Sequence, residues 1–203
     1  MSIVPKYDAV AESYSAADYA DAAAYYARRA RLVVEHGPRL QRGSTVLDIA
    51  CGDGGLGQPM LDLGIDYRGV DASQGMVDVA RRTLGERVRL GTFEYVPPEP
   101  VEAATIFRSL YLVHERRDFF ERVRSFTRAK LVFDFDPRAQ PADEIVADLR
   151  ATGWQRVDLR PFLMPQRARL PRALQALLFR VEPLPGSRVL TRVRFPLLVS
   201  ASA

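Results

Sequence analysis

The sequence predicts an α/β fold, in which a mostly parallel β-sheet is covered by helices on both faces. Three observations predict it. Short β-branched apolar runs alternate with helical segments along all 203 residues. A loop with four glycines, residues 51–57, follows the first apolar run, and an acidic residue closes each of the first two strands. In such sheets, ligands lie beyond the carboxyl ends of the strands, near the switch in strand order.

Helices are predicted where apolar residues recur every three or four positions. Residues 16–35 form the first, because Tyr26, Ala30 and Val33 share one face and a Gly-Pro pair at 37–38 stops the helix. The next helices are expected at 57–64, 73–84, 117–127, 142–152 and 171–181. Ser73 is the expected N-cap of the second of these.

Strands are predicted where short apolar, β-branched runs are bounded by turn residues. The first, residues 44–50, is short, apolar and β-branched, and Pro137 closes the fifth. In chain order the strands are expected at 44–50, 67–71, 87–91, 105–108, 130–136, 154–163 and 188–200.

Charge is distributed unevenly along the chain. The whole chain carries 29 basic and 25 acidic residues, a net charge of +4. Residues 1–154 have a net charge of −3, whereas residues 155–203 hold nine arginines against two acids, a net charge of +7. This pattern is typical of a surface that faces an anion, a nucleic acid or a membrane. The alternative is that the basic carboxyl-terminal part has no special partner. Arginine is simply the abundant basic residue of this chain, since 27 of its 29 basic residues are arginines.

Other residue types narrow the class of protein. A single cysteine, Cys51, excludes an intrachain disulfide and a Cys-rich zinc site, and two histidines are too few for a His-based metal cluster, so no metal is expected. No apolar run approaches the ~20 residues that span a bilayer, and the amino terminus lacks an apolar signal core. We therefore expect a cytoplasmic protein without a transmembrane segment.

The strongest motif is V-L-D-I-A-C-G-D-G-G-L-G at residues 46–57. Asp48 closes the strand, and the small residues Ala50, Gly52 and Gly54 follow at two-residue spacing. Small residues allow a ligand to approach the backbone closely, and the amino terminus of the next helix offers unpaired N–H groups. The run also fits G-x-G-x-x-G, but the dinucleotide fingerprint has its key acid about 20 residues later.

A second acid fits that later position. Asp71 ends the second strand, 17 residues after Gly54, within the run G-V-D-A-S-Q-G-M. A carboxylate there can accept hydrogen bonds from two ribose hydroxyls, which suits NAD as well as an adenosyl ligand. The glycine turn and this acid together therefore predict an adenine nucleoside site.

At this point the sequence resembles the class I S-adenosylmethionine-dependent methyltransferases, specifically the small-molecule branch that includes ubiquinone and menaquinone biosynthesis enzymes. Besides the two motifs above, Y-D-A-V-A-E-S-Y at 7–14 and F-R-S-L-Y-L-V-H at 107–114 carry the resemblance. It implies a Rossmann-like three-layer sandwich, whose seven-stranded, mostly parallel sheet has an antiparallel last strand. It also implies S-adenosyl-L-methionine as cofactor and S-adenosyl-L-homocysteine as product.

The resemblance assigns roles residue by residue. Asp48 and the glycine turn would hold the methionine part of the cofactor, and Asp71 would bind the ribose. Phe93 would flank the adenine from the third strand. The family often has an acid where this chain has Thr92, which accepts a hydrogen bond but brings no charge. The implied cofactor-binding set is Tyr14, Asp48, Ala50, Cys51, Gly52, Gly54, Asp71, Ala72, Met76, Thr92, Phe93 and Arg108.

Methyl transfer needs an aligned nucleophile and, where the nucleophile carries a proton, a base. His114, Tyr111 and Asp134 are the candidate catalytic residues. His114 follows the fourth strand, and histidine is the residue type most often used as a general base, although a packing role is the alternative for it. Asp134 shares a strand face with Asp136, where the two acids would bind an amine, polarise a hydroxyl, or simply pair with the nearby Arg138.

The whole chain, 1–203, is predicted to be one methyltransferase domain. Residues 1–42 would form a helical cap, 43–136 the cofactor-binding half, and 137–203 the substrate-side half. The helical insertion at about 165–182 is expected to cap the substrate pocket. Three arginines of the last strand, Arg188, Arg192 and Arg194, have even spacing and are expected on one face of it.

Three functions compete. The favoured one is methyl transfer from S-adenosylmethionine to an O, N or C nucleophile of an acidic or amphipathic small molecule, by a monomer or homodimer. The second is RNA methylation through the basic carboxyl-terminal part, although nucleic acid is not the expected partner. The third is an NAD-dependent oxidoreductase or a non-methylating nucleotide-binding domain, which is disfavoured because Asp48 precedes the glycines and no Tyr-x-x-x-Lys relay occurs.

Overall fold

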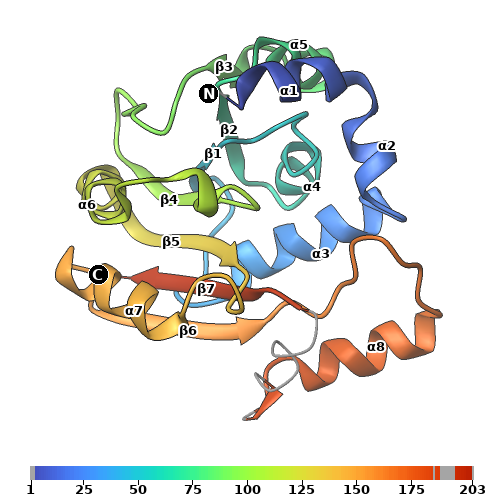
Figure 1. Ribbon diagram of the computed structural model, residues 1–203, viewed down its shortest axis with the longest axis vertical. Coiled ribbons are helices and arrows are strands. Elements are labelled where there is room, and N and C mark those ends of the chain that lie inside the picture. Colours follow the sequence, from blue (N-terminus) through green and yellow to red (C-terminus); the bar gives the residue numbers. More distant parts are fainter. Residues whose placement is uncertain (1–2, 185, 188–194, 203) are drawn as a thin grey trace.

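The computed structural model describes residues 3–184, 186–187 and 195–202. These residues form a seven-stranded sheet in the order β3-β2-β1-β4-β5-β7-β6 (Figure 1). β7 runs antiparallel to β5 and to β6, and the other paired strands are parallel. The predicted Rossmann-like α/β fold with an antiparallel last strand is confirmed. The strands are β1 Thr45–Ile49, β2 Asp66–Asp71, β3 Val88–Leu90, β4 Val101–Ile106, β5 Thr127–Phe135, β6 Arg156–Pro161 and β7 Leu197–Ser202.

Helices cover both faces of this sheet. The α-helices are α1 Val4–Val10, α2 Tyr14–Asp18, α3 Ala22–Glu35, α4 Gly57–Asp62, α5 Gln74–Leu84, α6 Arg116–Phe126, α7 Ala142–Ala151 and α8 Arg172–Val181. Short 3₁₀ turns lie at η1 Ala11–Ser13, η2 Gly85–Arg87 and η3 Leu110–Leu112. None of the described helices combines the length and apolar character needed to cross a bilayer.

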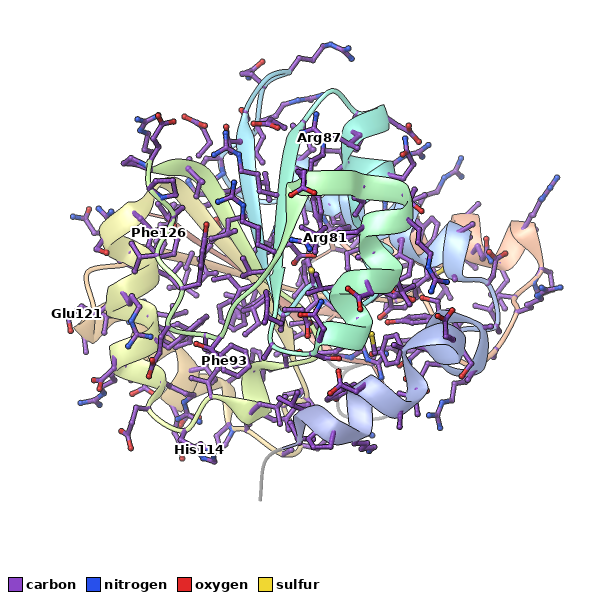
Figure 2. All side chains as sticks on the ribbon, turned by 90° about the horizontal axis from the view of Figure 1, so that it is seen from above. Arg81, Arg87, Phe93, His114, Glu121 and Phe126 are labelled. Atoms are coloured by element: carbon purple, nitrogen blue, oxygen red, sulfur yellow. The ribbon has the colours of Figure 1, made fainter. Side chains whose placement is uncertain are left out.

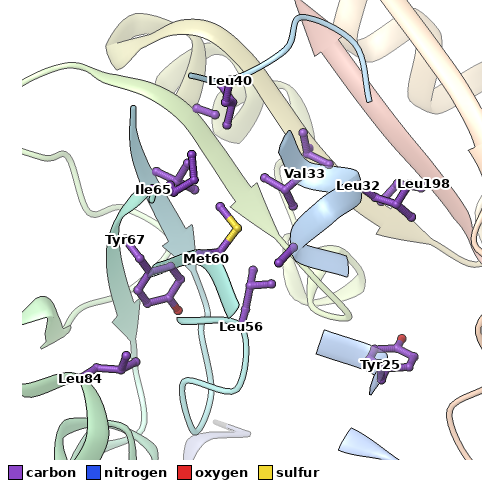
Figure 3. Close-up of a cluster of buried hydrophobic side chains, with 14 of the residues drawn as sticks. Tyr25, Leu32, Val33, Leu40, Leu56, Met60, Ile65, Tyr67, Leu84 and Leu198 are labelled. Atoms are coloured by element: carbon purple, nitrogen blue, oxygen red, sulfur yellow. The ribbon is translucent and has the colours of Figure 1, made fainter. Parts of the chain in front are cut away.

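Two apolar clusters hold the layers together. Figure 3 shows the first, which includes Val33 of α3, Met60 of α4, Leu84 of α5 and Tyr67 of β2. The second lies on the opposite face, where α6 and α7 pack on strands β1, β4, β5 and β7 around the buried Phe133. Both faces of the central strands are therefore buried, which explains why successive residues of β1 and of the second half of β5 are buried without alternation.

The predicted helix 16–35 is broken in the structure. Tyr19 has an extended backbone, φ −123° and ψ 128°, and α3 starts only at Ala22. The Asp21 side chain accepts a hydrogen bond from the Ala24 N–H at 3.0 Å, so it caps α3. This capping is the physical reason for the break. The predicted N-cap Ser73 is confirmed, because its hydroxyl accepts from the Met76 N–H at 3.2 Å.

Several strand boundaries also shift. β3 ends at Leu90, so Phe93 lies in the following loop rather than on the third strand. β4 covers 101–106, so the run at 107–114 follows that strand instead of forming part of it. β7 starts at Leu197 and ends at Ser202; residues 188–194 of the predicted last strand, with their three arginines, lie outside the described residues.

Candidate functional site

A cavity of about 520 Å³ lies beyond the carboxyl ends of β1, β2 and β4. This volume is in the range of small-molecule sites. The amino-terminal helices form its outer wall through Tyr7 and Tyr14. Eleven of the twelve residues in the predicted cofactor set line it, and the exception is Gly54. The eleven are Tyr14, Asp48, Ala50, Cys51, Gly52, Asp71, Ala72, Met76, Thr92, Phe93 and Arg108.

The turn after β1 has an unusual backbone. Ala50 has φ +57° and Gly52 has φ +58°, both in the left-handed region. Within the described part of the chain, Arg108 is the other non-glycine residue with a positive φ, at +55°. Such backbone costs energy for residues with a Cβ, and it concentrates at functional sites. Both strained residues, Ala50 and Arg108, line the cavity.

Gly54 has a packing role. Its φ is +77°, and a Cβ added there would lie 2.7 Å from Leu84 Cδ1 and 3.0 Å from Ala80 Cβ. The glycine therefore lets α5 pack closely on the turn, and it does not line the described cavity. The sequence pattern correctly indicates that position 54 needs a small residue. The neighbour that requires it is helix α5.

Asp71 is held rigidly at the cavity wall. One carboxylate oxygen accepts from the Gly52 N–H at 2.8 Å, and the other accepts from the Ser73 N–H at 2.9 Å. Burial raises the pKa of Asp71, and the backbone N–H groups of Ser73, Gly52 and Ala72 oppose that rise. Each oxygen keeps a lone pair for a further donor.

Asp48 lies deeper than Asp71. Its carboxylate accepts hydrogen bonds from the Thr105 hydroxyl at 2.6 Å and the Tyr67 hydroxyl at 2.9 Å. Burial raises its pKa to about 6, against the opposing effect of these two hydroxyls. Near neutral pH this side chain therefore presents a negative charge to the cavity.

Cys51 lies in the turn after β1 and is half-buried. Burial raises the pKa of its thiol well above the usual value. A thiol kept protonated is a poor nucleophile, so Cys51 serves as a small apolar wall residue.

Arg108 ties the amino-terminal segment to the end of β4. Its guanidinium donates to the hydroxyls of Tyr19 at 2.8 Å and Tyr14 at 3.1 Å, and it pairs with Asp18 at 3.2 Å. Burial raises the pKa of Tyr14 above its ordinary value, so this phenol stays neutral. These contacts hold α2 over the cavity.

A second cavity of about 530 Å³ adjoins the first and shares Tyr7, Tyr14, Arg108 and Ser109 with it. Two candidate catalytic residues, Tyr111 and Asp134, line this second cavity. The remaining wall comes mainly from the end of β5 and the loop after it, from residues 195–196 just before β7, and from the segment 164–168. The two cavities together give room for two ligands side by side.

The two acids of β5 have different partners. Asp136 pairs with Arg138 at 2.7 Å, as predicted. Asp134 is buried and pairs instead with the buried Arg29 of α3 at 2.5 Å, and its second oxygen accepts from the Arg108 N–H at 2.6 Å. The predicted pairing of Asp134 with Arg138 is therefore wrong, and both of its oxygens already accept hydrogen bonds.

His114 and Phe93 come from separate loops on the same side of the molecule (Figure 2). Both line the first cavity, and His114 is exposed on its rim. Tyr111 is 59% exposed, and its hydroxyl lies 3.2 Å from that of Tyr7. The Thr92 hydroxyl accepts from the Glu94 N–H at 3.2 Å, which organises the loop after β3.

The predicted capping role of the helical insertion is wrong in part. No residue of α8 lines either cavity, because α8 lies outside α3 and packs through the buried Glu182, which pairs with Arg28 and Arg160. The preceding segment, 164–168, does line the second cavity.

Sequence reasoning missed Arg29. Its guanidinium lies over the rings of Phe107 at 4.2 Å and Phe162 at 5.0 Å, and it lines the first cavity. A signal was available, because Tyr25, Arg29 and Val33 are spaced four apart on the buried face of α3. An arginine on an apolar stripe indicates a buried ion pair.

Comparison with protein families gives one match. Residues 46–130 match the family described as a methyltransferase domain, which is less than half of the chain. No curated protein sequence matches this one.

Solved structures share the fold at low sequence identity. One is a chain from a complex between the Haloferax volcanii Trm112 methyltransferase activator and the putative methyltransferase, with 18% identity and a TM-score of 0.71, covering 100% of this chain and 97% of that one. A putative methyltransferase from an antibiotic biosynthesis pathway of Anabaena variabilis has 16% identity and a TM-score of 0.64, covering 87% of this chain and 97% of that one.

The magnesium protoporphyrin IX methyltransferase of Synechocystis, solved with bound S-adenosylmethionine, has 16% identity and a TM-score of 0.58, covering 88% of this chain and 80% of that one. The resemblance to class I methyltransferases is thus confirmed. The ubiquinone-like branch stays a prediction.

Proposed function

We propose that this chain transfers a methyl group from S-adenosylmethionine to an O, N or C nucleophile of a small molecule. The match of residues 46–130 to a methyltransferase domain supports the reaction class. Solved structures of similar fold, including one with bound S-adenosylmethionine, support the cofactor.

Asp71 is the observation that carries the proposal. The Gly52 and Ser73 N–H groups fix its carboxylate beside the strained turn at the cavity wall. Fixed in this way, the carboxylate can accept both ribose hydroxyls without losing side-chain entropy on binding. Asp48 would then attract the positively charged methionine part, and the Phe93 ring would pack against the adenine.

The chemistry would run between the two cavities. The cofactor supplies a methyl group on a positively charged sulfur, which is activated for in-line displacement. His114 would take the proton of the acceptor as the new bond forms, and the Tyr111 hydroxyl would orient that acceptor. Asp134, with both oxygens occupied, would position Arg29 and the Arg108 backbone rather than act as a base.

The second cavity supports a small acceptor of acidic or amphipathic character. Its wall combines the aromatic rings of Tyr25 and Phe135 with the guanidinium groups of Arg108, Arg138 and Arg167. Aromatic rings suit an apolar body. The guanidinium groups pair with Asp18 and Asp136, but each has more N–H groups than these pairs use. The remaining donors of Arg108 and Arg167 suit the carboxylate or phosphate of a small acceptor.

Ion pairing weakens the case for RNA. Three arginines of the basic carboxyl-terminal part already pair with carboxylates, since Arg156, Arg160 and Arg167 contact Asp158, Glu182 and Asp18. An arginine that is paired in this way loses part of its attraction for a phosphate backbone. The second cavity, by its volume, is also better matched to a small molecule than to a polymer.

Replacing Asp71 by alanine tests the proposal. Loss of a charged hydrogen-bond acceptor should weaken binding of S-adenosylhomocysteine by about 10- to 100-fold in calorimetric titration. The matched control is Asp66→Ala, at the other end of β2, where Asp66 pairs with Arg68 and Arg87 on the surface. Equal affinity in the two variants would show that Asp71 has no part in the cofactor site.

A further inference from the structure

α8 stands apart from the helices that cover the sheet (Figure 1). Its side chains include leucines with large exposed areas, Leu174 at 41% and Leu177 at 56%, and Leu184 just after the helix is 54% exposed. An exposed leucine alone is ordinary, but Leu174 and Leu177 lie about 60° apart around α8 and form an exposed apolar strip on the helix.

This strip lies on the side of α8 that faces away from the protein. Phe179 packs under the Arg28 guanidinium at 4.2 Å, and Glu182 is buried against Arg28 and Arg160. At 100° per residue, Leu177 points about 200° away from Phe179 on the helix. The packed side and the solvent side of α8 are therefore both apolar, which a helix that only covers its own core does not need.

Both ends of α8 are cationic: Arg180 lies about 60° from Leu177 around the helix, and Arg172, in the first turn, lies on the side of Phe179. Arg172 and Arg180 are exposed on α8 and form no ion pair within the described part of the chain. Between residues 165 and 187, Glu182 is the sole acid in the sequence, and its charge is buried against two arginines. Exposed leucines flanked by arginines are the pattern of helices that lie in a membrane interface, where long cationic side chains reach the head groups.

We propose that α8 docks this protein on the surface of a bilayer that contains anionic lipids. Charge complementarity identifies the occupant, because Arg172 and Arg180 of α8 are exposed and no carboxylate of the described residues pairs with them. A second copy is disfavoured, since a two-fold interface through α8 would bring Arg172 and Arg180 of both chains together without acids to balance them.

Docking in this way would bring the second cavity near the membrane. Its wall includes residues 164–168, and α8 begins four residues later at Arg172. An amphipathic acceptor dissolved in the bilayer would then have a short path into the site. The docking itself does not depend on methyl transfer, because it rests on α8 alone.

Sedimentation with vesicles tests the proposal. The full chain should bind vesicles of phosphatidylcholine mixed with phosphatidylserine, and binding should be lost with pure phosphatidylcholine or at high salt. Replacing Arg172 and Arg180 together by glutamine should weaken the partition coefficient about 30-fold, and the double variant Leu174→Gln/Leu177→Gln should weaken it at least about tenfold.

The matched control is the double variant Arg89→Gln/Val96→Gln, which changes one exposed arginine and one exposed apolar residue away from α8. It should bind the mixed vesicles as the unmodified chain does. Thermal unfolding and sedimentation velocity of all variants complete the test. No binding to the mixed vesicles, equal loss in the control, or a dimer that dissociates when Leu174 and Leu177 are replaced would each overturn the proposal.

Discussion

The proposed role of Asp48 predicts that the affinity for S-adenosylmethionine depends on pH. Burial raises the pKa of this carboxyl to about 6, and only its ionised form attracts a cation. The ionised fraction is about 99% at pH 8 and about 10% at pH 5, given that pKa. We therefore expect the dissociation constant to rise about tenfold between pH 8 and pH 5.

Calorimetric titration across this range is the assay. Asp48→Asn keeps the shape and an oxygen acceptor for one of the two hydroxyls, Thr105 or Tyr67, but it lacks the charge. The variant should bind more weakly at pH 8 and lose most of the pH dependence. Asp71 titrates in the same cavity with a raised pKa, so the difference between the two proteins isolates Asp48. Identical pH profiles would refute the reasoning.

The same pKa has a consequence for stability. Because the folded value lies above the usual 3.8, folding favours the protonated carboxyl. The contribution of Asp48 to the free energy of unfolding is therefore full below pH 4 and falls as the pH rises through about 6.

Three further predictions concern stability and turnover. Arg29→Met should destabilise the fold by about 3–5 kcal/mol in urea unfolding, because its partner carboxylate stays buried without a counter-charge, whereas Arg128→Met at an exposed ion pair should cost under about 1 kcal/mol. Gly54→Ala should cost about 2–4 kcal/mol because its Cβ meets α5, while Gly43→Ala, with φ +85° and open space around it, should cost about 1–2 kcal/mol. His114→Ala should slow methyl transfer about 100-fold or more, measured with radiolabelled cofactor, and should leave cofactor affinity unchanged. A variant of Arg29 or Gly54 that is as stable as its control, or a His114 variant with unchanged turnover, would contradict the role assigned to that residue.

Local chemistry made most of the residues that line the first cavity predictable. Asp48 and Asp71 each close a strand, and the turn between them needs small residues, so the sequence alone places both acids at one sheet edge. The sheet with its antiparallel last strand followed from the resemblance. Two details in this region differ from the expectation: Phe93 lies in the loop after β3, and Gly54 lies against α5 instead of lining the described cavity.

Contacts between distant segments were not predictable in the same way. Arg29 and Asp134 are 105 residues apart, and only folding shows that they meet. Residues 19–21 lie within a helical pattern that the local cap at Asp21 interrupts. The place of α8 depends on Arg28 and Arg160, which approach Glu182 from two other elements.

The most direct test is parallel calorimetric titration of the unmodified protein with S-adenosylmethionine, S-adenosylhomocysteine and NAD. The geometry of Asp48, Asp71 and the turn predicts one site that binds both adenosyl ligands and has no measurable affinity for NAD. Tight binding of NAD, without binding of either adenosyl ligand, would contradict the central claim.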